Sequence, residues 1–429
     1  MKRKVILFAA LLLPLFVLAQ SNLGKADDKK TDDFVHENYF GGFTPEEFQL
    51  YKDAAKAGDV DAQYNVGYCY ENGEGVEQNY SEAAKWYRKA AEQGLSAAQH
   101  GLGFLYAYGQ GVKENWTEAA KWFSKAAEQG YGLSIFAMGA CYEDGNGVPQ
   151  NFVEAAKYYR KAVDKNVVEA YEALGRFYYI GGGVPQNYEE AVKLFAKGAA
   201  LRNPNAQYYL GLCYHFGNGI KADTTEAVKL YLLSAEQGFA PAQNELGNFY
   251  LTDPAHKDYK KALEWLNKAV AQDSPDAFFN MALCYEEGWG VEQNLKTAVE
   301  WNRKAALAGD AEAITKMGIA YEEGKGVEQN MTDAVKWYLK GAELGNSDAQ
   351  TNYAKCLLQG NGITQNYTEA IKWLEKAVAQ KNPIAINNLG FCYLNGFGVT
   401  ADLEKAEQYF QKAADMGYEL AKENLKMLK

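Results

Sequence analysis

The stretch DAQYNVGYCYENGEGVEQNYSEAAKWYRKAAEQG, from Asp61 to Gly94, decides the fold, because variants of it follow one another along the chain. Internal periodicity of this kind is the signature of repeat architectures. With Gly67 as the reference residue of the first copy, equivalent residues follow at steps of 36, with a single step of 35. The ten reference residues are Gly67, Gly103, Gly139, Gly175, Gly211, Gly247, Ala282, Gly318, Ala354 and Gly390. The 429-residue chain is therefore predicted to be an array of ten similar units.

Each copy contains two helical patterns and no alternating strand pattern. The first pattern has the i, i+4, i+7, i+8 spacing of one helix face, at Ala62, Val66, Cys69 and Tyr70. Gly73 and Gly75 end this helix, because glycine readily adopts the left-handed conformation of a helix terminus. Asn79 is a suitable N-cap for the second helix. The apolar face of the second helix consists of Ala83, Trp86, Tyr87 and Ala90.

The reference glycine lies inside the first helix, where glycine costs about 1 kcal/mol relative to alanine. The sequence predicts that a bulky Trp or Tyr of the second helix approaches it closely. The two exceptions, Ala282 and Ala354, carry the next smallest residue. Three positions after the reference, at +3, nine copies have Tyr, and six copies have Trp at +19. These aromatic residues are expected to lie in the core.

The N-terminus has the pattern of an export signal, predicted at residues 1–19. Lys2, Arg3 and Lys4 precede an apolar run that ends at Ala19. The run is too short to span a bilayer, so cleavage after Ala19 is expected. A periplasmic or secreted location follows, with no membrane span after cleavage. Residues 20–44 are predicted to be a flexible linker.

Six cysteines in an exported chain would ordinarily suggest three disulfides. All six occupy position +2, at Cys69, Cys141, Cys213, Cys284, Cys356 and Cys392. Other copies have Leu, Phe or Ala there, which is typical of a core site. Stacked helices lie about 8–10 Å apart, and a disulfide needs Cα atoms within about 7 Å. Six buried thiols are therefore predicted.

Charge and motifs exclude several classes of function. The 44 basic and 55 acidic residues give a net charge of −11, which argues against nucleic acid as a partner. The G-x-G elements join two helices, so they lack the context of a dinucleotide site. The four His residues show no ligand spacing. We expect no cofactor, no metal and no catalytic residue.

The recurring pattern A-x-x-x-L-G-x-x-Y-x-x-G-x-G-V-x-Q-N-x-x-E-A-x-K-W-Y-x-K-A-A-x-x-G resembles the Sel-one-like repeat, a branch of the tetratricopeptide superfamily. The resemblance covers residues 61–417. It implies an all-α fold, a right-handed α-solenoid (superhelix) of ten ~36-residue helix-turn-helix repeats. It also implies a role in protein–protein interaction and complex assembly, without naming a partner.

The array has two predicted caps and one irregular copy. Residues 45–60 form a lone second helix before the first copy, and residues 418–429 form a final helix rich in Lys and Glu. The sixth copy, near 247–273, has lost one residue, and Asp253-Pro254-Ala255 replaces its glycine motif. A local change of superhelical pitch is expected there.

A partner is expected on the first helices, which line the concave wall of stacked helix pairs. Positions −3, +1, +4 and +5 share one stripe and are predicted to be free of the core. In copies one to five they include Tyr64, Tyr68, His100, Phe104, Tyr108, Phe136, Glu172, Arg176, Tyr179, Tyr208, Leu212 and Phe216. Copies six to nine are more polar there, with Asn244, Asn248, Thr315, Glu322, Thr351 and Lys355.

Three hypotheses of function stay open. The leading one is an exported, non-enzymatic scaffold or adaptor that holds a protein or peptide partner in the concave groove, because exposed aromatic residues suit such contacts. The second is a binder of cell-wall glycan, since aromatic platforms also stack on sugar rings. The third is a hydrolase acting on cell-wall material. Against all three, curvature of the array could bury the aromatic residues against one another.

Overall fold

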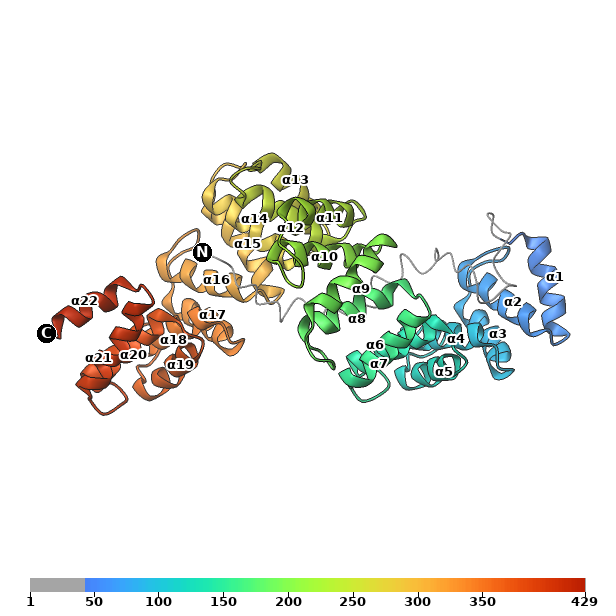
Figure 1. Ribbon diagram of the computed structural model, residues 1–429, viewed down its shortest axis with the longest axis horizontal. Helices are drawn as coiled ribbons and strands as arrows, with labels where there is room; N and C mark the ends of the chain where they lie inside the picture. Colours follow the sequence, from blue (N-terminus) through green and yellow to red (C-terminus); the bar gives the residue numbers. More distant parts are fainter. Residues whose placement is uncertain (1–42, 429) are drawn as a thin grey trace. The chain divides into compact units, whose positions relative to one another are not determined.

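The computed structural model describes residues 43–428, which form twenty-two helices and no strand (Figure 1). The predicted signal peptide and nearly all of the predicted linker lie outside the described residues. The first helices of the ten repeats are α2 (Val60–Asn72), α4 (Ser96–Tyr108), α6 (Gly132–Asp144), α8 (Val168–Ile180), α10 (Pro204–Phe216), α12 (Ala240–Thr252), α14 (Pro275–Glu287), α16 (Ala311–Glu323), α18 (Ser347–Gln359) and α20 (Pro383–Asn395). The second helices are α3 (Tyr80–Glu92), α5 (Trp116–Glu128), α7 (Phe152–Asp164), α9 (Tyr188–Ala200), α11 (Thr224–Glu236), α13 (Tyr259–Val270), α15 (Leu295–Leu307), α17 (Met331–Glu343), α19 (Tyr367–Ala379) and α21 (Leu403–Asp415).

The helices belong to two compact units, divided within α11 between Ala227 and Val228. Inside each unit, a first helix packs on the second helix of its own repeat and on the second helix of the repeat before it. First helices of adjacent repeats also touch, as α8 touches α10 in unit 1 and α12 touches α14 in unit 2. The expected all-α solenoid is confirmed. None of the helices between residues 43 and 428 is long and apolar enough to cross a bilayer.

Most of the reference glycines lie under an aromatic ring of the second helix, whereas Gly247 lies under Leu266. A Cβ atom on Gly67 would lie 2.5 Å from Tyr87 Cδ1, and one on Gly139 would lie 2.6 Å from Tyr159 Cδ1. The predicted close approach is therefore confirmed. The ring belongs to position +20, however, and not to the Trp at +19. That Trp is also buried, and the lysine at +22 covers it, with Lys89 Nζ 4.0 Å from the Trp86 ring centre.

The two glycines of each G-x-G element have different structural roles. The first ends the helix in the left-handed conformation, as Gly73 does with φ 74°. The second, which also has positive φ, touches the start of the preceding second helix. A Cβ atom on Gly75 would lie 2.5 Å from Thr44 O, and one on Gly398 would lie 2.7 Å from Tyr367 O. Because no side chain fits there, each loop fixes the stacking of two neighbouring repeats.

Buried glutamines join the same neighbours. Gln63 Nε2 donates to Ala55 O of the preceding helix at 3.2 Å, and Gln63 Oε1 accepts from Gln93 Nε2 at 2.8 Å. Gln99 makes the same two hydrogen bonds one repeat later. Since these amides lie where unpaired polar groups would be costly, they fix the register of the stack.

The caps and the irregular copy differ from the regular repeat. The first cap is α1 (Pro45–Lys56), and the last is α22 (Glu419–Met427). In the sixth copy α12 ends on Asp253 with extended backbone, and the Asp253 side chain accepts hydrogen bonds from the amides of Ala255 and His256.

The six cysteines are all free and buried, which confirms their prediction. Burial is also the main reason why their pKa values are raised, to about 12 for Cys141.

Candidate functional site

Position −3 on the first helices lies against the core, which corrects the prediction that this position is free of the core. In the first three repeats the side chains at this position cover the +20 ring of their own repeat and are half-buried. The two rings are 5.5 Å apart in the pairs Tyr64–Tyr87, His100–Phe123 and Phe136–Tyr159. Each of these three predicted binding residues therefore exposes only part of its ring.

Position +4 serves the core in another way, through a hydrogen bond that the sequence analysis missed. Where position +20 is tyrosine and position +4 is glutamate, the hydroxyl donates to the carboxylate. The distances are 2.5 Å for Tyr87–Glu71, 2.6 Å for Tyr159–Glu143 and 2.5 Å for Tyr338–Glu322. A buried hydroxyl needs such an acceptor. Copies with Phe or Leu at +20 have an apolar or aromatic +4 residue instead, as with Phe123 and Ala107.

His100 is held neutral by its surroundings. Burial lowers its pKa to about 4. Its Nδ1 atom lies 2.9 Å from Ser134 Oγ of the next repeat. Ser134 has no exposed surface, so this Ser–His pair is closed to a substrate.

Glu172 and Arg176, two further predicted binding residues, lie below the surface. They are 2% and 3% exposed and form an ionic cluster with Glu143. Arg176 Nη2 lies 2.7 Å from Glu143 Oε1, and Arg176 Nε lies 3.4 Å from Glu172 Oε1. Burial, together with the charge of Glu143, raises the pKa of Glu172 to about 7 and that of nearby Asp144 to about 6. The cluster joins the third repeat to the fourth.

The last predicted residues are divided between core and surface. Tyr179 and Leu212 are buried, and Tyr179 Oη accepts from Asn218 Nδ2 at 2.8 Å. Tyr208 is half-buried beside the ring of Tyr209, 5.3 Å away. Phe216 is 44% exposed, the largest fraction among the predicted residues.

An accessible aromatic group persists on α2 and α4. It consists of Tyr68, Phe104 and Tyr108, and we call it the aromatic patch. All three side chains are half-buried, and the rings of Phe104 and Tyr108 are 4.5 Å apart. Tyr68 has the ring of Phe43 6.3 Å away. The patch is thus partly held in place by its own contacts and partly open to solvent.

The same face of unit 2 is polar and bonded across repeats. Lys316 Nζ lies 3.0 Å from Glu286 Oε2, and Lys355 Nζ lies 2.7 Å from Glu322 Oε1. Farther toward the start of the unit, Asn280 Nδ2 donates to the Asn244 side chain at 2.8 Å. The two units therefore offer different chemistry on their first helices.

Comparisons with known proteins agree with this architecture. The model of the Sel1 repeat family matches residues 60–95, 96–131, 132–167, 168–203, 204–239, 240–274, 275–310, 311–346, 347–382 and 383–418. A solved structure of c5321, a protective antigen in uropathogenic Escherichia coli strains that displays an SLR fold, is similar, with 36% identity, a TM-score of 0.66, and coverage of 90% of this chain and 83% of that one. A Sel1 repeat protein from Oxalobacter formigenes has 35% identity over 52% of this chain and 94% of its own, with a TM-score of 0.48.

A search of curated proteins finds no match. The ten contiguous matches follow the repeat boundaries that the glycine spacing predicts, and they cover most of the chain. The chain therefore belongs to the Sel1 repeat family.

Proposed function

We propose that this chain is an exported, non-enzymatic scaffold that binds a partner protein or peptide along the first helices of unit 1. The single observation that carries the proposal is the aromatic patch of Tyr68, Phe104 and Tyr108. Membership of a repeat family with a scaffold-like fold supports it. The export signal that the sequence predicts supports the proposed location.

The patch suits protein binding for two physical reasons. Large aromatic side chains supply much of the binding energy at interfaces, because they bury a large area for few rotatable bonds. The rings here are also partly ordered before binding, which lowers the entropic cost of association. Neighbouring Asn72, at position +5 of the first repeat, is exposed and lies at the edge of the patch.

The test is photo-crosslinking in whole cells with a photoreactive residue at Asn72. We expect one discrete crosslinked protein, which is lost when Tyr68, Phe104 and Tyr108 are all replaced by serine. Helical content should stay unchanged, because none of the three is fully buried.

Phe391→Ser is the matched control, because Phe391 occupies position +1 in the tenth repeat, as Tyr68 does in the first. It should leave the crosslink intact. Crosslinking that survives the triple substitution would overturn the proposal, and retention of the chain on cell-wall glycan that depends on the patch would favour the glycan hypothesis.

A further inference from the structure

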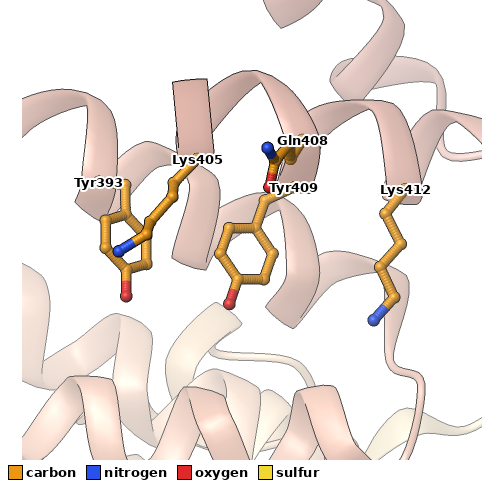
Figure 2. A pocket seen from close by; sticks show the side chains of 5 residues that line it. All are labelled: Tyr393, Lys405, Gln408, Tyr409 and Lys412. Carbon is orange, nitrogen blue, oxygen red and sulfur yellow. The ribbon is translucent and has the colours of Figure 1, made fainter. Parts of the chain in front are cut away.

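The last repeat, in unit 2, carries a pocket between its two helices. It has a volume of about 310 Å³ and is lined by Tyr393 of α20 and by Lys405, Gln408, Tyr409 and Lys412 of α21 (Figure 2). Every lining side chain carries a hydrogen-bond donor, and none is a carboxylate. Two lysines line the pocket, with carboxylates next to it: Asp402 Oδ2 lies 3.6 Å from Lys405 Nζ, and Gln408 Nε2 donates to Glu404 Oε1 at 3.4 Å.

Two tyrosine rings form one wall of the pocket. The rings of Tyr393 and Tyr409 are 5.6 Å apart and nearly parallel, at 12°. Lys405 Nζ lies 5.2 Å from the centre of the Tyr393 ring. In Figure 2 both hydroxyls point to the same side, with Lys405 beside Tyr393 and Lys412 beyond Tyr409. Within residues 43–428 neither hydroxyl has a hydrogen-bond partner, so both are available to a ligand.

The charge of the pocket is a departure from the repeat. Seven other repeats have an acidic residue where Lys405 stands and a lysine three residues later, and in six of them the two side chains form a described ion pair. These pairs are Glu82–Lys85, Glu118–Lys121, Glu154–Lys157, Glu190–Lys193, Asp333–Lys336 and Glu369–Lys372. In the last repeat the residues are Lys405 and Gln408. Asp402, 3.6 Å from Lys405, also caps the helix N-terminus, so it neutralises the lysine only in part.

The preceding repeat also differs at this place. In regular repeats an arginine of the preceding second helix donates to the +3 tyrosine, as Arg303 does to Tyr321 at 2.8 Å. The residue equivalent to Arg303 before Tyr393 is Glu375. Glu375 does not line the pocket. Its negative charge nevertheless acts on Tyr409, a residue that lines the pocket. The pKa of Tyr409 is raised by burial and also by the nearby Tyr393 and Glu375.

We propose that this pocket binds an acidic sugar, a uronic acid unit with one carboxylate on a pyranose ring. Lys412 would hold the carboxylate, the tyrosine rings would pack on the apolar face of the sugar, and the phenols and Lys405, at the other end of the pocket, would bind its hydroxyls. The volume is at the lower end of the roughly 300–1,000 Å³ of ligand pockets, which suits one or two sugar rings. The proposal is independent of the partner site on unit 1.

The first test is titration of the chain from Gln20 to Lys429 with glucuronate, followed by calorimetry and ligand-observed NMR. Glucose and acetate are the comparators, because each offers half of the chemistry. We expect both to bind at least tenfold more weakly than glucuronate. No glucuronate binding, or equal binding of acetate, would overturn the proposal. A methyl glucuronoside that binds as well as glucuronate would indicate a glycan-linked ligand, and its failure would indicate the free sugar acid.

Three variants locate the site. Lys405→Glu with Gln408→Lys restores the ion pair of the regular repeats, so it should fold normally and lose at least tenfold in affinity. Glu375→Gln should raise the affinity two- to threefold, because it removes a nearby negative charge. Lys161→Ala is the matched control in the third repeat, where Tyr142 and Tyr158 stack in the same way at 5.6 Å. It should have no effect. Wild-type affinity in the double variant, or an equal loss in Lys161→Ala, would refute the assignment.

Discussion

Replacement of Gly103 by alanine tests the packing rule on which the whole array depends. In an exposed helix the change would stabilise by about 1 kcal/mol, because alanine is the better helix former. Here the new Cβ atom would lie 2.7 Å from Phe123 Cε1 and 3.2 Å from Ala119 O. Comfortable carbon contacts are about 3.5–4.0 Å, so the ring has to move by about 1 Å. Overpacking of this kind costs roughly 1–3 kcal/mol. We expect a net loss of about 0–2 kcal/mol in the free energy of unfolding.

The assay is urea unfolding followed by circular dichroism, completed by a double-mutant cycle. The ninth repeat already combines Ala354 with Leu374 at the equivalent positions. Gly103→Ala with Phe123→Leu should therefore lose less stability than the sum of the two single changes. Ala354→Gly, the reverse change, relieves no clash and should cost about 1 kcal/mol through helix propensity alone. A Gly103→Ala variant more stable than the wild type would refute the reasoning.

Three other outcomes are expected. Glu172 has a pKa of about 7 in the folded state, above its value of about 4.3 in the unfolded state. Because the folded state therefore binds the proton more tightly, the free energy of unfolding should fall as pH rises between these two values. Glu172→Gln should flatten this slope in urea midpoints measured from pH 4 to 8, and an unchanged slope would contradict the assignment. Tyr338→Phe removes the donor to Glu322 and should lower the free energy of unfolding by about 1.5–3 kcal/mol, whereas a change within about 0.5 kcal/mol would show that this hydrogen bond adds little. Thiol titration of the denatured, unreduced chain from Gln20 to Lys429 should find six thiols, and the native chain should react slowly; fewer than six in the denatured chain would indicate a disulfide.

The repeat spacing predicted the fold because it reports backbone requirements. A glycine such as Gly67, recurring every 36 residues inside a helical pattern, indicates a place where a side chain does not fit. The aromatic ring that makes it unfit could not be identified from the spacing alone, since both Trp86 and Tyr87 lie on the apolar face of the second helix. Only the packed structure shows that the Tyr87 ring covers the glycine and that Lys89 covers the Trp86 ring.

The candidate face was harder to predict, because a helical stripe does not reveal what covers it from the next repeat. Glu172 and Arg176 occupy stripe positions that would be exposed on an isolated helix pair. They are buried because first helices of adjacent repeats touch, which places Glu143 of α6 beside Arg176 of α8. A signal was nevertheless present in the sequence. An unpaired charge cannot be buried cheaply, so one arginine between two glutamates on successive repeats indicates an ionic cluster.

The pairing of positions +4 and +20 links the core of several repeats to the candidate face on the first helices. In three repeats a core tyrosine donates to a glutamate at +4, as Tyr159 does to Glu143, whereas Phe123 has Ala107 at that position; in the fifth repeat Tyr231 has His215 there. In those three repeats the chemistry of the inner face is therefore not free to vary, and part of its acidity serves tyrosines of the core. Position +1 binds no core tyrosine in the first two repeats, where the rings of Tyr68 and Phe104 are partly exposed to solvent. For this reason the proposed partner of unit 1 should be sought first at these two residues. An acidic side chain such as Glu71 should be assigned to partner binding only after its core tyrosine has been replaced by phenylalanine, because that replacement separates the two roles of the carboxylate.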